Sequence, residues 1–338
     1  MSADSTLAEA IDRRTNRTFL SWLIGRQVFW VSLATVLAVI YLSLATTTFD
    51  TQQNIFNVTR NFAFVGIVGL GMTAVIITGG IDLSVGSAVL ISAMTTTLIM
   101  HAGLPITLAL PAAMAAALLV GFINGFFIAV VGLPPFVVTL GMMSVARSIG
   151  MVLSNNALIY EFGPDQPILF DIGGGSVPIL GIPVPNPVLV LIALGLLTGF
   201  ALRWTKWGRH LYAIGGNERA AILTGVPVKT VKISVYMFAS LCAGITGFLQ
   251  TGWLGSVTTG LGTGLELTVI AAAVIGGANL AGGTGTAVGA IVGAALIEVI
   301  RNSLILLGIS TFWQGTFVGC FIVLAVAFDR LRNKDTGE

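Results

Sequence analysis

Residues 62–100 read FAFVGIVGLGMTAVIITGGIDLSVGSAVLISAMTTTLIM and decide the fold. Two apolar runs, 62–78 and 83–100, are separated by a short Gly-rich break that holds Asp82, the only charged residue of the stretch. An α-helix needs about 20 mainly apolar residues to cross the hydrocarbon core of a bilayer. The stretch therefore predicts two consecutive membrane-spanning helices.

The composition extends this prediction to the whole chain. Of 338 residues, 55% are hydrophobic and 9% are charged, whereas a soluble domain carries about a quarter charged residues. The apolar residues are spread along the chain, which excludes a single anchor on a globular domain. The net charge of +2 comes from few charges and indicates no nucleic-acid partner. We expect an all-α, polytopic integral membrane helix bundle.

Ten apolar runs are candidates for the spans. They cover residues 28–46, 62–78, 83–100, 106–131, 136–153, 187–202, 233–253, 267–280, 287–307 and 312–328. The eighth run is short enough to be a broken or re-entrant element, so we expect eight to ten spans. The N-terminal segment lacks a small-residue cleavage site after a short apolar core, which predicts that the first span is not cleaved.

The charged residues predict the orientation of the spans. Basic residues cluster at the N-terminus, between residues 203 and 232, and in the C-terminal tail, whereas residues 154–186 hold three acidic residues and no Lys or Arg. Cytoplasmic loops carry an excess of Lys and Arg. We therefore expect cytoplasmic termini (1–27 and 331–338), one membrane domain (28–330), a loop on the outer side (154–186) and a cytoplasmic loop (204–232).

Residues 79–83 and 276–280 form a weak internal echo. They read GGIDL and GGANL, and each ends one apolar segment and starts another. Gly-interrupted segments at corresponding places in two halves are typical of transporters. In a Gly-rich chain, five such residues can also match by chance.

The cytoplasmic loop contains the pattern of a short capped helix between Asn217 and Pro227. Asn217 can cap its N-terminus, Glu218 suits the positive end of the helix dipole, and Gly225 can adopt the left-handed C-terminal conformation. A helix of about two turns is not stable alone in water, so its apolar residues need a packing partner. The alternative is a plain interfacial loop.

Ionisable residues inside apolar runs are costly and are candidates for function. Arg147 either faces a wet cavity or, as we favour, is paired inside the bundle. Glu298 and Arg301 are three residues apart, and we expect an ion pair on one helix face. Asp82, with Ser84, could line the inner mouth of a pathway, but capping of the next helix is the favoured role.

Several stretches resemble the sugar-type permease subunits of bacterial ABC importers, the ribose permease group. The most specific is AIGGNERAA at 213–221 with Gly225 and Val226, and the next is GGIDLSVGS at 79–87. Further matches are PFVVTLG at 135–141 with Ala146 and Arg147, residues 266–283, Arg301-Asn302, and LLG at 306–308. Together they cover roughly residues 55–330.

The resemblance implies a fold, partners and residue roles. It implies that a segment of the cytoplasmic loop docks into a separate ABC ATPase. The residues of this segment are Asn217, Glu218, Arg219, Ala220, Ala221 and Gly225. It also implies a periplasmic sugar-binding protein, a second permease copy, and a multi-pass location in the bacterial inner membrane. Arg219 stands where the family often has Pro or another residue, and Thr284 stands where a basic residue often follows the double Gly.

A pathway for uncharged polyols needs hydroxyls, amides and aromatic side chains rather than a strong ion site. We expect such a pathway to involve Asp82, Ser84, Phe136, Thr139, Ser144 and Asn302. The sequence does not tell which sugar or polyol is carried.

Other functional classes find less support in the sequence. No Gly-x-x-x-x-Gly-Lys-Ser/Thr motif occurs, so ATP must be hydrolysed by another chain, and we expect neither enzyme activity nor a cofactor. We expect no metal site, and Cys242 and Cys320 lie in apolar runs where thiols behave as small hydrophobes. The alternative is an ion-coupled secondary transporter of a small polar solute, which needs a protonatable site near mid-bilayer, and only Glu298 comes close.

Overall fold

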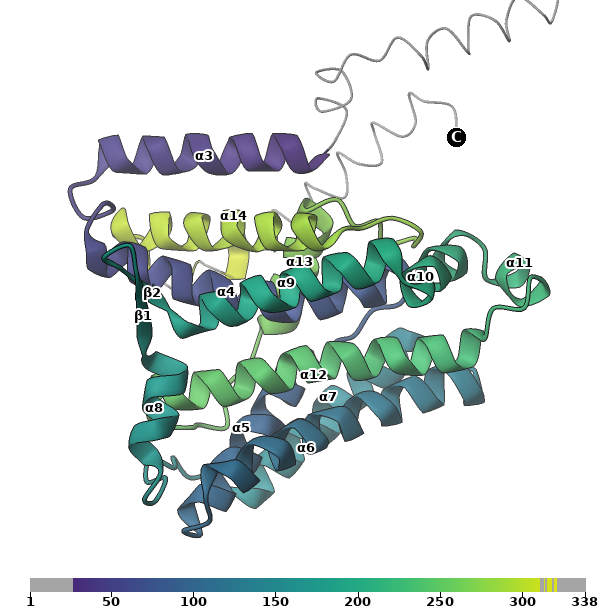
Figure 1. The fold of residues 1–338 in the computed structure, drawn as a ribbon, viewed down its shortest axis with the longest axis horizontal. Helices are drawn as coiled ribbons and strands as arrows, with labels where there is room; N and C mark the ends of the chain where they lie inside the picture. The colour runs from purple at the N-terminus through teal and green to yellow at the C-terminus, as the bar shows by residue number, and fades with distance from the viewer. Residues whose placement is uncertain (1–26, 311–312, 314, 318, 321–338) are drawn as a thin grey trace, which may run out of the picture.

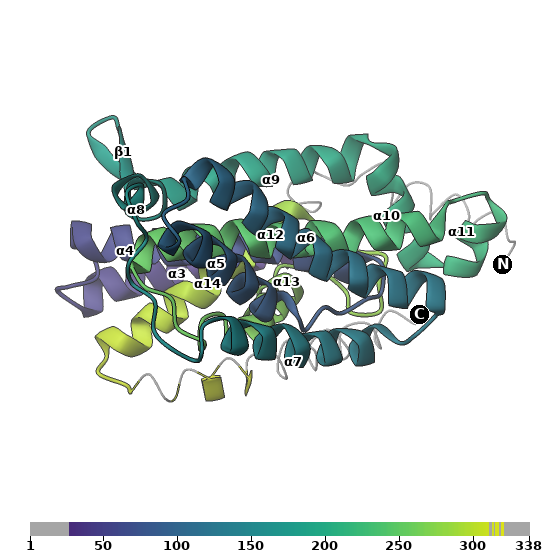
Figure 2. The ribbon, with the colours of Figure 1, turned by 90° about the horizontal axis from the view of Figure 1, so that it is seen from below.

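The computed structural model describes residues 27–310, 313, 315–317 and 319–320. Among them, seven helices are long and apolar enough to cross a membrane, and they lie side by side in Figures 1 and 2. They are α3 (Gln27–Ala45), α4 (Gln52–Ile77), α6 (Ile106–Phe126) with its π-helical extension η1 (Phe127–Val131), α7 (Pro135–Leu153), α9 (Asn186–Trp204), α12 (Val228–Leu254) and α14 (Ala287–Leu306). The prediction of a mainly helical membrane bundle is confirmed.

Two further apolar helices are shorter than a span. They are α5 (Val85–His101), with 17 residues, and α13 (Leu265–Ile275), with 11 residues. At 1.5 Å per residue, 11 residues extend about 16 Å, roughly half of the hydrocarbon core. The expectation that the eighth run forms a short element agrees with α13, whereas most of the tenth run and both predicted cytoplasmic termini lie outside the described residues.

Helix α4 is the centre of the bundle. All of its residues from Ala63 to Ile77 are buried, and it packs against α9, α12, α13 and α14. Small residues allow this close packing, since a Cβ atom on Gly71 would lie 2.6 Å from the Cα atom of Ala239 in α12. Such close approach of small residues is typical of helix packing in membranes, where lipid tails compete for apolar surfaces.

The two ends of the long helices carry different structures (Figure 1). One end holds α10 (Lys206–Gly216) and α11 (Glu218–Leu223), and the opposite end holds α8 (Gln166–Gly174) and the antiparallel strands β1 (Ser176–Ile179) and β2 (Ile182–Pro185). Leu180 and Gly181, both with positive φ, form the two-residue turn of this hairpin. The sequence analysis predicted neither the hairpin nor α10.

The two Gly-rich breaks of the internal echo have the same backbone design. Helix α4 ends with Gly79 at φ +75°, and the N–H of Gly80 donates to the carbonyl of Val75; α13 ends with Gly277 at φ +96°, and the N–H of Ala278 donates to that of Ala273. This six-to-one bond after a left-handed residue is the Schellman C-cap. The capping glycines are Gly79 and Gly277, whereas the alignment of GGIDL with GGANL pairs Gly79 with Gly276. The structural correspondence is therefore shifted by one residue from the sequence alignment.

Candidate functional site

Helix α11 is capped as its sequence predicts. The side-chain oxygen of Asn217 accepts a hydrogen bond from the N–H of Ala220 at 3.0 Å, and Gly225 has φ +81°. The N–H of Gly225 donates to the carbonyl of Ile222 at 3.0 Å, which closes the C-terminus. The helix itself covers only the six residues Glu218–Leu223, about 1.7 turns, so it is slightly shorter than the two turns expected.

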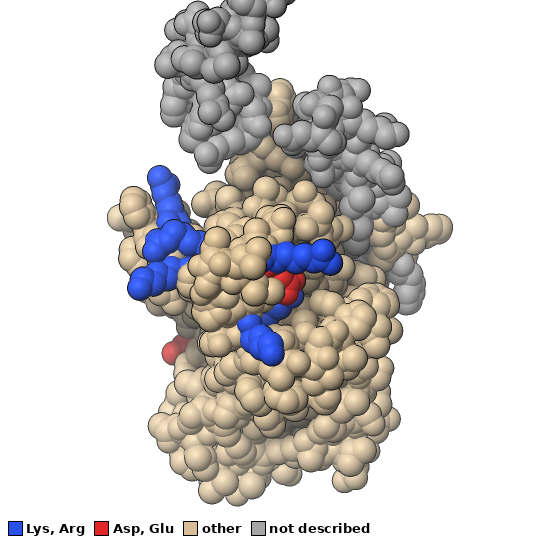
Figure 3. Space-filling view, turned by 90° about the vertical axis from the view of Figure 1, so that its right-hand side faces the viewer, with Lys and Arg blue, Asp and Glu red and all other residues tan. Residues whose placement is uncertain are grey.

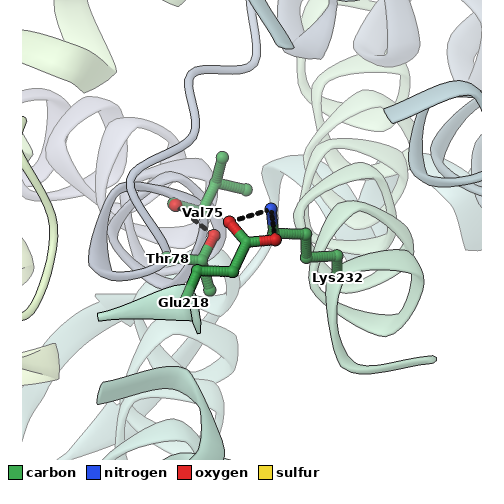
Figure 4. A network of polar contacts seen from close by, with 4 residues as sticks. All are labelled: Val75, Thr78, Glu218 and Lys232. Atoms are coloured by element: carbon green, nitrogen blue, oxygen red, sulfur yellow. Dashed lines mark hydrogen bonds and ion pairs between the residues drawn. The ribbon is translucent and has the colours of Figure 1, made fainter. Parts of the chain in front are cut away.

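One ion pair joins α11 to the first turns of α12. The ammonium group of Lys232 donates to both carboxylate oxygens of Glu218, at 2.7 and 2.8 Å (Figure 4). Both groups are accessible to solvent, so the pair contributes roughly 0.2–1 kcal/mol. The pair links α11 to α12 and contributes little to the stability of the fold.

The apolar residues of α11 have two different environments. Ala221 is buried against the rest of the chain, whereas Ile222 is 57% and Leu223 is 88% exposed. The expectation that the apolar residues of this helix need a packing partner is met within the chain for Ala221, but not for Ile222 or Leu223. Lys and Arg side chains gather on this end of the molecule (Figure 3), where Arg203, Lys206, Arg209, Arg219 and Lys229 are exposed. The exposed side chains of Ile222 and Leu223 therefore lie among basic residues, outside the apolar helix bundle.

Helix α10 connects this surface to the bundle. The Tyr212 hydroxyl donates to the carbonyl of Gly285 at 2.8 Å, and the Trp207 indole donates to the Ser234 hydroxyl at 2.8 Å. Burial raises the pKa of Tyr212 above its ordinary value, so the hydroxyl keeps the proton that it donates. These bonds tie α10 to the α13–α14 connection and to α12.

The predicted residues Asp82 and Ser84 form a buried polar cluster with Asn124. One carboxylate oxygen of Asp82 accepts from the N–H and the hydroxyl of Ser84, at 2.8 and 2.6 Å, and the amide of Asn124 donates to the Ser84 hydroxyl at 2.8 Å. All three side chains are fully buried. Asp82 therefore bonds to the residue that precedes α5 rather than to the amides of its first turn, which corrects the capping prediction in detail.

The three predicted pathway residues of α7 do not share one environment. Thr139 is buried, and its hydroxyl lies 3.0 Å from the carbonyl of Pro135 and 3.3 Å from that of Ile81, next to the Asp82 turn. Phe136 and Ser144 lie on the exposed side of the helix. In this conformation, only Thr139 lies beside the Asp82 cluster.

Asn302 lies far from the other predicted pathway residues. Its amide exchanges two hydrogen bonds with Asn54, at 2.8 and 3.2 Å. Asn54 is in the first turn of α4, and Asp82 follows the last turn of this 26-residue helix. The helix is about 39 Å long, so the two groups belong to opposite ends of the bundle.

Arg147 is held by backbone carbonyls. One guanidinium nitrogen donates to the carbonyls of Thr259 and Leu261, at 2.9 and 2.8 Å, and Glu266 supplies a nearby negative charge. The arginine thus fastens α7 to the connection between α12 and α13. The favoured role of Arg147, pairing inside the bundle, agrees with this arrangement, but the sequence analysis did not identify Glu266 as its charged neighbour.

The two other charged residues predicted inside the spans, Glu298 and Arg301, pair with each other. Glu298 is buried, and a carboxylate oxygen lies 3.5 Å from a guanidinium nitrogen of Arg301, as the three-residue spacing predicted. Arg60 was not among the predicted intramembrane charges, because the predicted span begins at Phe62, whereas α4 begins ten residues earlier. The Arg60 guanidinium lies 4.3 Å from the ring centre of Trp253 and donates to Asn57 at 2.7 Å.

Comparison with known protein families identifies the class of the chain. Residues 54–326 match the family described as the branched-chain amino acid transport system / permease component. The match covers most of the chain, so the protein belongs to this family of transport permeases. The sequence-based resemblance to permease subunits of ABC importers is confirmed.

Individual relatives cover nearly the same range. The chain is 41% identical to a probable ABC transporter permease protein of Sinorhizobium fredii, over 84% of this chain and 83% of the relative. It is 35% identical to the ribose import permease protein of Escherichia coli K12, over 93% and 96% of the two chains. The D-allose transport system permease protein of the same strain is 34% identical, over 91% and 94%. No solved structure matches the chain.

Proposed function

We propose that this chain is the membrane permease subunit of an ATP-binding-cassette importer and forms the pathway for a monosaccharide or related polyol. The ribose and D-allose permeases support a sugar, because each aligns over more than nine-tenths of both chains. The family description names branched-chain amino acids instead. A sugar is favoured, since those two relatives cover the chain more completely than the family match does.

The end of the bundle that holds α10 and α11 faces the cytoplasm of a bacterium, and both termini lie on this side of the inner membrane. The exposed basic residues of this end support the orientation. The opposite end, with α8 and the β1–β2 hairpin, then faces the periplasm, where a sugar-binding protein delivers the substrate. Asp165, Asp171 and Glu161 lie in the segment on that side.

The separate ATPase docks on α11. The observation that carries this proposal is the exposed pair Ile222 and Leu223 on a helix that is capped at both ends and bordered by cations. Closure of the ATPase on ATP pushes α11, and the spans tilt between inward-open and outward-open states. No covalent bond is made or broken in this chain.

A second permease copy completes the pathway. The outer side of α7 supports this arrangement, because Phe136, Ser144 and their apolar neighbours Val137, Val145 and Val152 are exposed there. Phe136 and Ser144 line the interface in this proposal. Asp82, Ser84, Thr139 and Asn302 are enclosed within one chain, so they contact substrate only in a state in which the helices have moved.

The proposal is tested in two steps. The binding protein encoded beside this chain is screened by thermal shift against ribose, allose, other pentoses and hexoses, inositol, tetritols, leucine and valine, which identifies the solute. The purified chain, ATPase and loaded binding protein are then reconstituted in proteoliposomes. We expect uptake that requires ATP hydrolysis. Uptake by the chain alone, driven by an ion gradient, would instead support a secondary transporter.

A further inference from the structure

Three segments that are distant in the sequence meet through their backbones beside α11. The N–H of Gly283 donates to the carbonyl of Ile77 at 2.9 Å and so joins the α13–α14 connection to the end of α4. Gly215, in the last turn of α10, lies against this bond. A Cβ atom at position 215 would overlap both the Ile77 oxygen and the Gly283 nitrogen, so a side chain there requires the segments to move apart.

Two more contacts surround the same point. A Cβ atom on Gly282 would lie 2.9 Å from the carbonyl oxygen of Gly215 and 3.1 Å from the backbone nitrogen of Gly79. Tyr212, one turn before Gly215, donates its hydroxyl proton to the carbonyl of Gly285. We call the set Gly79, Gly215, Gly282 and Gly283 the glycine junction. Its contacts are between main chains, so no side-chain rotation can absorb a displacement.

The glycine junction lies between the proposed docking helix and the buried core. Gly215 precedes Asn217, the N-cap of α11, by two residues. On the other side, Gly79 ends the buried helix α4 and begins the turn that carries Asp82 and Ser84. A movement of α11 that is transmitted through α10 therefore acts, at the glycine junction, on the backbone beside both Gly-rich breaks.

We propose that Gly215 is a positioning residue of the transport cycle, through which displacement of α11 passes into α4 and the α13–α14 connection. This proposal rests on the proposed function as an ATP-driven importer. The α11–α12 connection provides a second, covalent route into α12, whose Tyr236 side chain lies against Gly80 of the first Gly-rich break. The glycine junction supplies the main-chain link, which also includes the α13–α14 connection, so it sets how much substrate movement follows each ATP.

The neighbouring residue Gly216 provides a matched control. It has the same side chain and follows Gly215 directly, but it is exposed, and a Cβ atom there would meet no atom within 4 Å. Gly215→Ala and Gly216→Ala thus make the same chemical change with opposite steric consequences. Any general effect of alanine on this segment is common to both variants.

The test measures molecules of solute imported per ATP hydrolysed, using the full importer in proteoliposomes and the solute identified with the binding protein. We expect Gly215→Ala to retain its ATPase on purification and to lower this ratio about tenfold or more, and Gly216→Ala to stay within about twofold of the wild type. A defect in folding lowers the amount of complex but leaves the ratio unchanged. A wild-type ratio in Gly215→Ala, or an equal loss in Gly216→Ala, would overturn the proposal.

A second variant keeps the test decisive if Gly215→Ala does not insert. Tyr212→Phe removes only the hydroxyl that bonds Gly285, and we expect it to lower the ratio roughly threefold. In that case, an unchanged ratio in Tyr212→Phe would overturn the proposal. Failure of the proposed function is distinguishable, because the wild-type importer would then show no ATP-dependent uptake.

Discussion

Asp82 and Asn217 use the same local device in opposite surroundings. Each side chain accepts a hydrogen bond from a backbone N–H two or three residues further on, where a helix begins. Asp82 is enclosed with Ser84 and Asn124, whereas Asn217 starts a helix whose residues Ile222 and Leu223 face outward. The hydrogen bonds of the first region lie within one chain, although the second carboxylate oxygen of Asp82 and the amide oxygen of Asn124 have no partner among the described residues. In the proposed function, the second region is covered only by a partner. Mutations should therefore affect stability in the first region and coupling in the second.

The largest effect on stability is expected for Asp82→Ala. The variant leaves the Ser84 N–H and hydroxyl without their buried acceptor, which costs roughly 1–3 kcal/mol of unfolding free energy. The measurement is the thermal unfolding midpoint of the purified chain in detergent, followed by tryptophan fluorescence. Asp82→Asn keeps one acceptor oxygen and should lose less. An Asp82→Ala midpoint equal to that of the wild type would show that the enclosed cluster does not stabilise the fold.

The opposite result is expected for Leu223→Asp, which alters the exposed region. Its unfolding free energy should stay within about 0.5 kcal/mol, because the side chain packs against little of its own chain. Its affinity for the ATPase should fall by about tenfold or more, since a charge replaces an apolar anchor. Pull-down at several ATPase concentrations measures this loss.

Leu180→Asp is the matched control for this prediction. Leu180 is 99% exposed, but it lies in the β1–β2 turn at the other end of the bundle. The Leu180→Asp variant should bind the ATPase with the same affinity as the wild type. Equal ATPase binding by both variants would remove α11 as the docking surface.

A smaller effect is expected for the Glu218–Lys232 pair. Glu218→Gln and Lys232→Met, alone and together, define a double-mutant cycle for which we expect a coupling energy of roughly 0.2–1 kcal/mol that decreases with salt. Thermal unfolding of the four proteins at two salt concentrations measures it. A coupling energy well above this range, or one unaffected by salt, would contradict the prediction that this solvent-accessible pair contributes little to the stability of the chain.

The sequence predicted the features that depend on neighbouring residues. The caps of α11 at Asn217 and Gly225 and the Glu298–Arg301 spacing follow local rules, and the structure contains all of them. Seven of the ten apolar runs coincide with the long apolar helices for the same reason. Arg60 was missed because the predicted span begins at the first apolar residues, near Phe62, whereas α4 begins ten residues earlier in the chain.

Contacts between distant residues were not predictable from the sequence. Asn124 meets Ser84 across 40 residues, and Tyr212 meets Gly285 across 73 residues. The overlap that a side chain on Gly215 would cause depends on where Ile77 and Gly283 lie in space. The adjacent residues Gly215 and Gly216 carry the same letter, so only the fold distinguishes the packed position from the open one.

The most direct test of the account is the stimulation of ATP hydrolysis by the loaded binding protein in importers that carry Gly225→Pro or Gly132→Pro. Both glycines have a φ near +80°, which proline cannot adopt, and both donate an N–H that ends a helix. Gly225 ends α11, whereas Gly132 ends the extension of α6. The account predicts that both variants insert and that only Gly225→Pro loses stimulation and uptake. Wild-type stimulation in Gly225→Pro would contradict it.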